Sequence, residues 1–362
     1  MTDSMPDTGL SDSAADIAQK LLDWYDQYGR ELPWRLHPRS RAPSQRPDPY
    51  QVWLSEVMLQ QTTVVVVAGR FETFVRLWPT VHDLAAAADE SVMAAWAGLG
   101  YYARARNLLK CARRIVDDHD GVFPQCPAEL ETLPGIGPYT AAAIASIAFN
   151  QPSAAADGNI ERVLARLFAI ETPLPKAKTQ LRQLAGDLCP QQRSGDWLQG
   201  LMDLGSLICR PRNPKCDDCP LAQNCIARQE SIQETLPRRS PQHRRRTARG
   251  ILYVGRRQDG AWLLEYRPPG GLYGGMLGWP GWGWAENAQQ HQPPCQGNWQ
   301  RVGDISHMLT HMDLHLEIHT AHLPIDAVPK AGQFIPSGQF RVDALPSLMR
   351  KAHALVIARQ SG

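Results

Sequence analysis

The most chemically distinctive residues of this chain are four cysteines in a short, Pro-containing stretch. They are spaced as Cys209-x6-Cys216-x2-Cys219-x5-Cys225. Four thiolates held by irregular loops can wrap one inorganic centre, and this uneven spacing is typical of an iron–sulfur cluster. Structural zinc is the first alternative, but zinc ligands usually come as two close pairs, and only Cys216 and Cys219 form such a pair. The spacing therefore favours iron–sulfur and leaves zinc open.

A glycine-rich turn forms the second candidate site. Residues 133–140 read Leu-Pro-Gly-Ile-Gly-Pro-Tyr-Thr and run into an Ala-rich apolar segment. Gly135 and Gly137 allow a tight turn that aims backbone amides outward at the start of a helix, which suits a phosphate. An ordinary connection between two helices is the alternative. The acidic motif Asp157-Gly-Asn159 follows about one helix later and favours the functional interpretation.

Length and composition set limits on these interpretations. The chain has 362 residues, which is enough for two domains, because single cores seldom grow past roughly 250 residues. The formal net charge is +2, so contact with nucleic acid must come from local basic clusters. The longest apolar stretch, 141–149, is far shorter than the roughly 20 residues that span a bilayer. The cysteine pattern and the lack of a basic apolar leader predict a reducing, cytoplasmic location.

The hydrophobic periodicity predicts two folded parts joined by a linker. An Asp- and Ser-rich tail, 1–18, is expected to be disordered. Residues 19–228 alternate amphipathic segments with Gly or Pro breaks and predict an all-helical domain, which includes 62–67 despite its β-branched residues. The polar stretch 229–249 predicts a linker. Residues 250–362 predict an α+β domain with paired strands near its start and a helix near its end.

The turn, the acidic motif and the cysteines together resemble the helix-hairpin-helix DNA glycosylase superfamily, and within it the iron–sulfur branch. The segments Leu32-Pro-Trp-Arg35 and Ser55-Glu-Val-Met-Leu-Gln-Gln-Thr62 resemble the signature of the adenine-specific glycosylases of that branch. The resemblance covers about residues 19–228, with the hairpin at about 133–148 and the cluster loop at 209–225. It implies one 4Fe–4S cluster held by the four cysteines, and a double-stranded DNA substrate.

The residue at position 139 separates two kinds of enzyme in this superfamily. Bifunctional members have a lysine there, which attacks the sugar and forms a Schiff base. This chain has Tyr139, which cannot do so. A monofunctional enzyme that leaves an abasic site is therefore implied. A bifunctional pyrimidine-lesion lyase and a non-catalytic DNA-binding protein with structural zinc remain as alternatives.

The resemblance assigns the chemical step to two carboxyl groups. Glu56 is implied to be the acid that protonates the departing adenine, a role that needs a raised pKa in an enclosed site. Asp157 is implied to stabilise the oxocarbenium-like transition state, and it can also cap the following helix. Tyr139 and Asn159 complete the implied catalytic set. The implied adenine pocket is formed by Arg30, Trp34, Arg35, Leu59 and Gln199. Burial in a core would explain the Trp and the Leu equally well.

Two residues are implied to act as wedges. Removing a base requires it to leave the stack, so a side chain must fill the gap. Gln61 and Tyr101 match the family's wedge positions, although Tyr101 would also fit a core. Arg104 and Arg106 flank the tyrosine and would suit a phosphate-facing edge. The full set of implied DNA contacts in the helical domain is Gln61, Thr62, Tyr101, Gly135 and Gly137.

The second domain resembles the Nudix-like domain of adenine glycosylases, which contacts 8-oxoguanine on the opposite strand. Ser306 and His307 match its lesion-reading loop. After residue 250 there is no run of Arg and Glu of the kind that holds magnesium in Nudix hydrolases, so recognition without pyrophosphatase activity is expected. The two resemblances together imply an enzyme that acts on adenine opposite 8-oxoguanine or guanine. The protein is expected to be a monomer.

Two features of this second domain are not explained by the resemblance. His311, His315 and His319 recur at every fourth position, and alternating apolar residues favour an exposed strand face over a metal site. The Trp-rich segment 278–284 has no assigned role.

Overall fold

Apolar residues at helical spacing determine where the first helix lies. Ile17, Leu21 and Tyr25 of α1 (Leu10–Tyr28) are all buried. The computed structural model describes residues 10–42, 45–241, 246–268, 272–282, 292–309 and 312–360. The expected disordered tail 1–18 is wrong for residues 10–18, because they belong to this amphipathic helix. Residues 1–9 lie outside the described residues.

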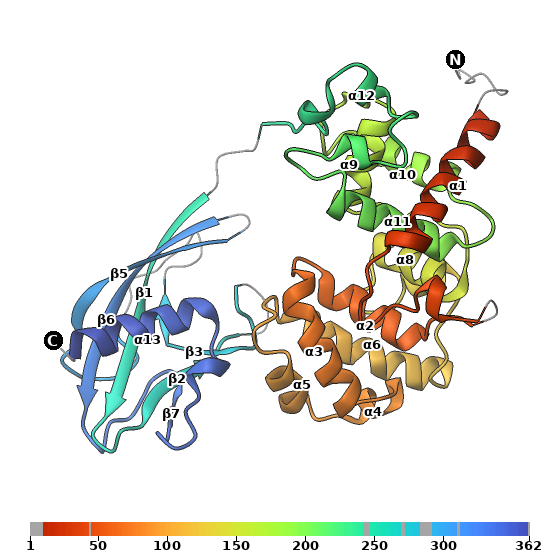
Figure 1. Ribbon diagram of the computed structural model, residues 1–362. Helices are drawn as coiled ribbons and strands as arrows, with labels where there is room; N and C mark the ends of the chain where they lie inside the picture. The colour runs from red at the N-terminus through yellow and green to blue at the C-terminus, as the bar shows by residue number, and fades with distance from the viewer. Residues whose placement is uncertain are drawn as a thin grey trace, which may run out of the picture. The chain divides into compact units, whose positions relative to one another are not determined.

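The chain divides into two compact units, which are described separately here (Figure 1). Unit 1 comprises Met1–Leu99 and Arg104–Pro241, and unit 2 comprises Gly100–Ala103 and Gln242–Gly362. The α-helices of unit 1 after α1 are α2 (Pro49–Leu59), α3 (Val64–Leu77), α4 (Val81–Ala86), α5 (Asp89–Ala95), α6 (Ala103–His119), α7 (Pro127–Leu130), α8 (Pro138–Phe149), α9 (Gly158–Leu167), α10 (Lys178–Asp187), α11 (Ser194–Leu207) and α12 (Ile226–Gln229). Its 3-10 helices are η1 (Pro38–Ser40), η2 (Cys216–Asp218) and η3 (Gln233–Thr235).

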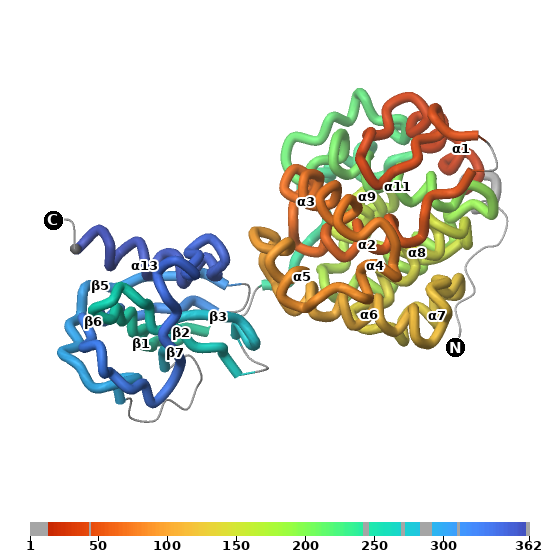
Figure 2. Tube along the Cα trace, turned by 90° about the horizontal axis from the view of Figure 1, so that it is seen from below, coloured from red at the N-terminus to blue at the C-terminus, as the bar shows by residue number. Residues whose placement is uncertain are grey.

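Helix α8 lies at the centre of unit 1. Its residues from Thr140 to Ala148 are all buried, and it packs against α2 and against α11 (Figure 2). Small side chains permit this close approach: a Cβ added at Gly195 of α11 would lie 2.7 Å from the carbonyl oxygen of Ser146. The packing places the start of α8, which carries Tyr139, beside the helix that carries Glu56.

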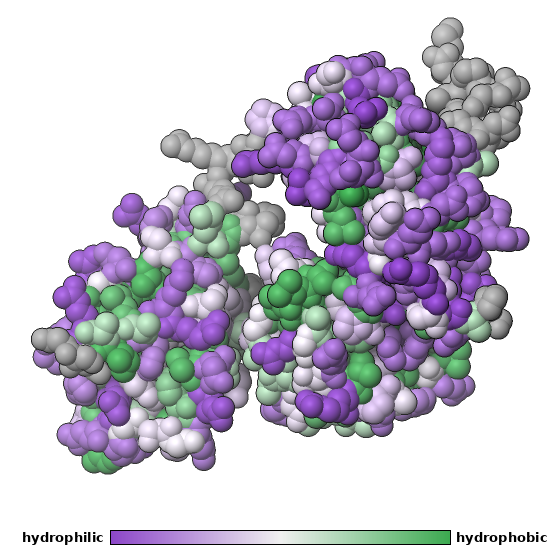
Figure 3. Space-filling model, in the orientation of Figure 1, coloured by the Kyte–Doolittle hydropathy of each residue, from purple (hydrophilic) through white to green (hydrophobic). Residues whose placement is uncertain are grey.

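The break between α2 and α3 corrects one prediction. Residues 62–67 were expected to be helical throughout, but helix resumes only at Val64. Gln61 has a φ of 57° and interrupts the helix between the two segments. At the start of α3, Val65 is 87% exposed and Val66 is 46% exposed, and Figure 3 shows hydrophobic side chains gathered in this part of unit 1.

The segment after α12 is not the linker that its polar composition predicted over 229–249. The backbone amide of Leu174 donates to the carbonyl of Arg238, and the amide of Ser240 donates to the carbonyl of Leu174. Leu236 is buried. Backbone pairing and one buried leucine therefore hold this polar segment on unit 1 as far as Pro241, and residues 242–245 lie outside the described residues.

Unit 2 is a mixed β-sheet with one helix packed against it, as expected for an α+β domain. Its strands are β1 (Arg246–Arg257), β2 (Trp262–Tyr266), β3 (Leu277–Gly278), β4 (Gly281–Trp282), β5 (Gln300–Met308), β6 (Met312–Leu323) and β7 (Gln333–Ile335), followed by η4 (Val342–Ala344) and α13 (Ser347–Gln360). The central order is β3-β2-β1-β6-β5, with β4 paired to β1 and β7 to β2. Strands β1 and β6 are parallel over their whole length, and the other pairs are antiparallel.

The Trp-rich segment supplies part of the core of unit 2. Trp279 is fully buried among residues of the sheet and α13, and its indole N–H donates to the carbonyl of Met349 over 2.9 Å. Its ring contacts Trp262 at 5.6 Å between centroids and stacks on His353 at 6.0 Å. Part of the segment, 283–284, lies outside the described residues. The described part therefore has a structural role.

Among the described residues, no helix is long and apolar enough to cross a membrane.

We predict that Trp279→Ala lowers the free energy of unfolding of unit 2 by about 3–5 kcal/mol, because it empties a buried site of indole size and removes a hydrogen bond. Urea unfolding followed by a probe confined to unit 2 would measure this, since two units need not unfold together. Trp282→Ala is the matched control, as Trp282 is 41% exposed. Equal losses in the two variants would contradict the prediction.

Candidate active site

Glu56 is buried at the end of α2. The N-cap of this helix is Asp48, whose carboxylate accepts a hydrogen bond from the amide of Tyr50, and Pro49 is its first residue. The Glu56 side chain is almost fully buried, and this burial raises its pKa to about 7, with a further upward contribution from the negative charge of Asp157. The positive charge of Arg35 and a hydrogen bond with Tyr139 act in the opposite direction and lower the pKa of Glu56. The carboxyl group can therefore hold a proton near neutral pH.

Tyr139 lies in the first turn of α8 and is the hydrogen-bonding partner of Glu56. Burial, and then the negative charges of Glu56 and Asp157, hold the pKa of the phenol well above its usual range. The phenol therefore remains a donor, and its hydrogen bond favours the charged form of the carboxylate.

Asp157 is the N-cap of α9, as its position before a helix predicted. One carboxylate oxygen accepts hydrogen bonds from the amides of Asn159 at 2.9 Å and Ile160 at 2.8 Å. The other accepts from the side-chain amide of Asn159 at 3.0 Å. N–H groups thus hold both oxygens in place, an arrangement that suits an anion.

A chain of hydrogen bonds connects Asp157 to the cysteine loop. Arg162 donates from one terminal nitrogen to the side-chain oxygen of Asn159 at 3.0 Å and to the carbonyl of Gly205 at 2.6 Å. Its Nε donates to the carbonyl of Cys209 at 2.8 Å. Arg162 was not predicted from the sequence, although its place three residues after Asn159 on a helix puts it on the same face.

The four cysteines line one cavity, together with Arg166. Arg166 is 2% exposed; it donates to the Cys209 sulfur at 3.3 Å and to the carbonyls of Arg210 and Pro211. Among the described residues, no three His, Cys, Asp or Glu side chains lie close enough to hold a single metal ion. Four thiols that line one cavity are compatible with the iron–sulfur cluster that their spacing predicts.

The two glycines of the hairpin differ in backbone conformation and in the space around them. Gly135 has a φ of +79°, and a Cβ there would lie 2.8 Å from the Cβ of Asn107 on α6. Gly137 is the N-cap of α8 with a φ of −99° and has open space around it. Ile136, between them, is buried. The hairpin is therefore anchored by Ile136, while Gly137 leaves the amino end of α8 accessible.

Three family models match parts of the chain. The HhH-GPD superfamily of base excision DNA repair proteins matches residues 54–191, the iron–sulfur binding domain of endonuclease III matches 209–225, and the NUDIX domain matches 251–355. Human adenine DNA glycosylase is 32% identical over 405 residues, covering 94% of this chain and 74% of the human protein. The mouse adenine DNA glycosylase is 32% identical and covers 98% of this chain and 81% of the mouse protein.

The chain belongs to the adenine DNA glycosylase family. Unit 1 also resembles solved structures: a thermostable thymine-DNA glycosylase has 28% identity and a TM-score of 0.54, covering 61% of this chain and 99% of that one. Endonuclease III in a non-covalent complex with DNA has a TM-score of 0.50 at 22% identity, covering 61% of this chain and 98% of that one, which shows the shared fold. The helix-hairpin-helix fold, the iron–sulfur domain and the Nudix-like unit predicted from the sequence are all confirmed.

The structure brings only part of the expected adenine pocket to the carboxyl groups. Arg35 interacts with Glu56 and also donates to Asp203 at 2.7 Å, as Arg30 does. Asp203 is fully buried and was not predicted from the sequence. The other predicted residues are held by packing: Trp34 lies edge-on to Phe71, Leu59 is half-buried, and Gln199 donates to the carbonyl of Gly195.

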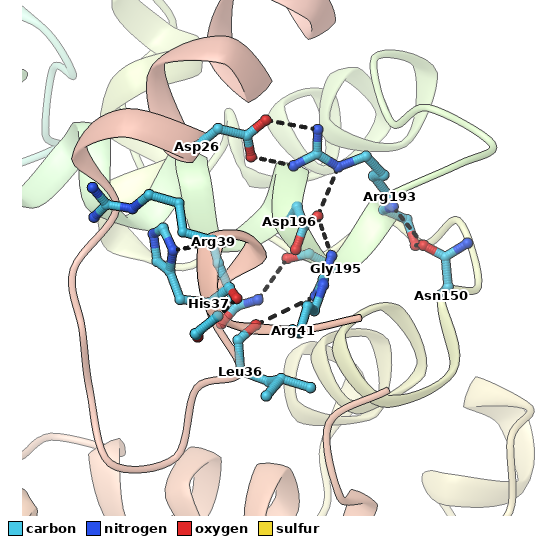
Figure 4. Close-up of polar contacts among 12 residues, drawn as sticks. Asp26, Leu36, His37, Arg39, Arg41, Asn150, Arg193, Gly195 and Asp196 are labelled. Carbon is cyan, nitrogen blue, oxygen red and sulfur yellow. Dashed lines mark hydrogen bonds and ion pairs between the residues drawn. The ribbon is translucent and has the colours of Figure 1, made fainter. Parts of the chain in front are cut away.

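A second network of charges, also missed from the sequence, ties three segments of this family member together (Figure 4). Asp196 of α11 is 2% exposed and accepts from Arg41 at 2.6 Å and from Arg193 at 2.8 Å. Arg193 also pairs with Asp26 of α1. A buried carboxylate held by two guanidinium groups is satisfied, and the network fixes α11 against α1 and the segment before α2.

The two expected wedges lie on turns with unusual backbone geometry. Gln61 is exposed with a φ of 57°, and Tyr101 is 53% exposed with a φ of 46°. The core alternative for Tyr101 is therefore wrong. Arg104 does not present a phosphate-facing guanidinium, which corrects the sequence-based interpretation, because its terminal nitrogens donate to four protein oxygens.

Ser306 and His307 lie on strand β5 and not in a loop, which corrects the prediction. Consecutive strand residues point to opposite faces. Ser306 is exposed and lies 3.0 Å from Nδ1 of His315, whereas His307 is affected by Lys351 of α13, on the other face. The two side chains therefore lie on opposite faces of the sheet. His315 and His319 lie on strand β6, which confirms the strand interpretation for these two; His311 lies outside the described residues.

We predict that Gly135→Ala destabilises the hairpin, whereas Gly137→Ala does not. A left-handed backbone costs a residue with a Cβ about 1–2 kcal/mol, and steric overlap with Asn107 adds to this at Gly135. Thermal unfolding of the two variants measures the difference. An equal change in melting temperature would show that the hairpin does not require the left-handed turn.

Proposed function

We propose that this protein removes adenine opposite 8-oxoguanine or guanine in duplex DNA, as the first step of base excision repair. Membership of the adenine DNA glycosylase family supports the base that is removed. The observation that carries the chemistry is the buried carboxyl group of Glu56, whose pKa is raised to about 7 next to the capped carboxylate of Asp157. Glycosidic bond cleavage needs an acid that carries a proton near neutral pH and a second carboxyl group held close to the sugar.

In the proposed mechanism, protonated Glu56 donates its proton to the adenine ring, so that the base leaves as a neutral molecule. The bond between the base and the anomeric carbon breaks, and its electrons go to the base. The positive charge that develops on the sugar is stabilised by Asp157, which Asn159 and the amino end of α9 hold in place. Water adds to the anomeric carbon and gives up a proton to the Glu56 carboxylate, which regenerates the acid and leaves an abasic site.

The proposed enzyme is monofunctional. Tyr139 occupies the position where a lysine would act as nucleophile, and its phenol is a hydrogen-bond donor to Glu56. No amine is therefore supplied from this position for a Schiff base. The DNA strand is expected to stay intact until the abasic site is treated with alkali.

The proposed DNA contacts follow from exposure and backbone geometry. Gln61 and Tyr101 are exposed on tight turns and can enter the space left by the extruded base. The amino end of α8 after Gly137 is open and can hold a phosphate through backbone amides. We further propose that the protein acts as a monomer and that unit 2 reads the opposite base near the β5–β6 turn, with Ser306 as the exposed polar side chain.

The direct test is release of adenine from matched duplexes that differ only in the base opposite adenine. Purified protein should release adenine opposite 8-oxoguanine or guanine more rapidly than opposite thymine. Glu56→Gln keeps the shape but removes the proton, and should reduce the single-turnover rate by about 10²–10⁴-fold. Full activity of Glu56→Gln would exclude this carboxyl group as the acid.

Borohydride trapping tests the absence of lyase chemistry. The protein should give no covalent adduct with DNA, while Tyr139→Lys provides a control in which an amine is present at that position. Trapping by the unaltered protein would favour the bifunctional alternative.

The raised pKa of Glu56 predicts a characteristic pH dependence. The acid is active when protonated, so the single-turnover rate should fall as pH rises above about 7. The hydrogen bond from Tyr139 favours the charged form and lowers this pKa; Tyr139→Phe removes it, so the pKa rises and the falling limb should move to higher pH. A limb that moves to lower pH, or does not move, would contradict the assignment.

We propose that the iron–sulfur domain holds one 4Fe–4S cluster through Cys209, Cys216, Cys219 and Cys225. Burial raises the pKa of Cys219 to about 12 and raises those of Cys216 and Cys225, so cluster binding must displace protons. When bound, the cluster would cross-link the loop from 209 to 225. The protein should absorb broadly near roughly 400 nm and contain about four iron and four sulfide per chain. A colourless preparation with stoichiometric zinc would contradict this.

A further inference from the structure

Arg104 joins three segments that are separate in the sequence. It is the second residue of α6, and one terminal nitrogen, Nη1, donates to the carbonyls of Val57 at 3.0 Å and Met58 at 2.9 Å. The other, Nη2, donates to the Thr62 hydroxyl at 3.0 Å and to the carbonyl of Leu99 at 2.9 Å. One planar group therefore binds the end of α2, the turn after it and the turn before α6.

The first pair of contacts acts on the helix that carries Glu56. Carbonyls in the last turn of a helix have no partner within the helix and are often satisfied by an Arg or Lys side chain. Val57 and Met58 follow Glu56 directly, in the last turn of α2. A shift of Arg104 would therefore shift or fray the turn that holds the acid.

The second pair of contacts acts on the two turns that carry the exposed wedge residues. Thr62 follows Gln61, and Leu99 lies two residues before Tyr101; both wedges have positive φ. A non-glycine residue in this region costs energy and persists only where the surroundings hold it. The Thr62 hydroxyl also lies 3.4 Å from the carbonyl of Leu99, so the two turns are neighbours around the guanidinium.

The guanidinium itself is fixed against the core. Its central carbon lies 5.3 Å from the centre of the Trp96 ring. Trp96 is fully buried and packs edge-on against Phe74 of α3, with ring centres 5.9 Å apart. A cation held over an aromatic face and bonded at both terminal nitrogens has little freedom to reorient.

We propose that Arg104 is a positioning residue that holds both DNA-facing turns and the end of α2 that carries Glu56 in one fixed arrangement. Insertion of Gln61 and Tyr101 into the duplex and placement of the Glu56 proton then depend on the same guanidinium. The inference rests on the proposed glycosylase function. It adds that extrusion of the base and its protonation are coupled through a residue that touches neither the base nor the sugar.

Lysine cannot replace this group. An ammonium has the same charge, but its three N–H donors are all on one nitrogen. The guanidinium reaches acceptors on two sides because its donors are on separate nitrogens. Arg104→Lys therefore keeps the charge and breaks the bridge. Arg113→Lys is the matched control: Arg113 lies on the same helix and donates to the carbonyls of Ala85 and Ala87 and to Asp89, away from both turns.

Hydrogen exchange of the free protein tests the bridge without any catalysis. In Arg104→Lys, amides in the 59–63 and 98–102 segments should both exchange faster than in the unaltered protein, whereas Arg113→Lys should change neither. Faster exchange in only one of the segments, or in neither, would overturn the proposal. If Arg104→Lys does not fold, Thr62→Val removes one acceptor of the bridge and should loosen the same two segments to a smaller extent.

Single-turnover kinetics test the coupling. A 2-aminopurine beside the target adenine reports unstacking by an increase in fluorescence. Arg104→Lys should lower both the rate of this increase and the rate of adenine release by roughly ten- to hundredfold relative to Arg113→Lys. Loosened turns with a rate equal to that of Arg113→Lys would overturn the coupling. If the unaltered protein releases no adenine from any duplex, the proposed function fails, and the exchange result alone decides whether Arg104 forms the bridge.

Discussion

The structure of the site depends on burying the carboxyl group of Glu56 next to a second one, that of Asp157. Two negative charges in a site with little water repel each other strongly, and the least costly solution is for one group to keep its proton. Glu56 is that group, because its burial raises its pKa to about 7, while the N–H groups at the start of α9 hold the side chain of Asp157 in place. The packing of α2, α8 and α9 buries Glu56 and also places it close to the N-capping side chain of Asp157.

Charged residues around this pair are themselves held by partners that lie far away in the sequence. The positive charge of Arg35 lowers the pKa of Glu56, and Arg35 is itself held by the buried Asp203 of α11. A buried guanidinium without such a partner would be costly, and a buried Asp203 without Arg30 and Arg35 would be costly too. The site is therefore stable only when α2, α8 and α11 are assembled together.

Hydrogen bonds also connect the cysteine loop to the carboxyl groups of the site. Arg162 and Arg166 lie four residues apart on α9 and direct their donors to the loop that begins at Cys209. Arg162 also holds Asn159, which holds Asp157. Loss of order in the loop would reach the Asp157 carboxylate through two hydrogen-bonded side chains, Arg162 and Asn159, which gives the iron–sulfur domain a physical connection to the reaction centre.

The sequence by itself determined what depends on residue type and short spacing. The cysteine spacing, the glycine-rich hairpin, the N-cap at Asp157 and the two-unit division could all be identified because local geometry and chemistry require particular residues there. It did not reveal Asp203, Arg162 or the bridge of Arg104, because most of their partners lie 42 to 173 positions away in the sequence. Nothing in a linear pattern predicts such pairs.

Tertiary structure also decided the cases in which a local pattern was misleading. Polar composition predicted disorder near the amino end and a linker after α12, but one apolar helix face and one buried leucine hold these segments in place. The match at Ser306 and His307 predicted a loop, and the strand turned the two side chains apart. In each case the packing of distant segments outweighed a weak local preference, which is why composition alone could not predict the outcome.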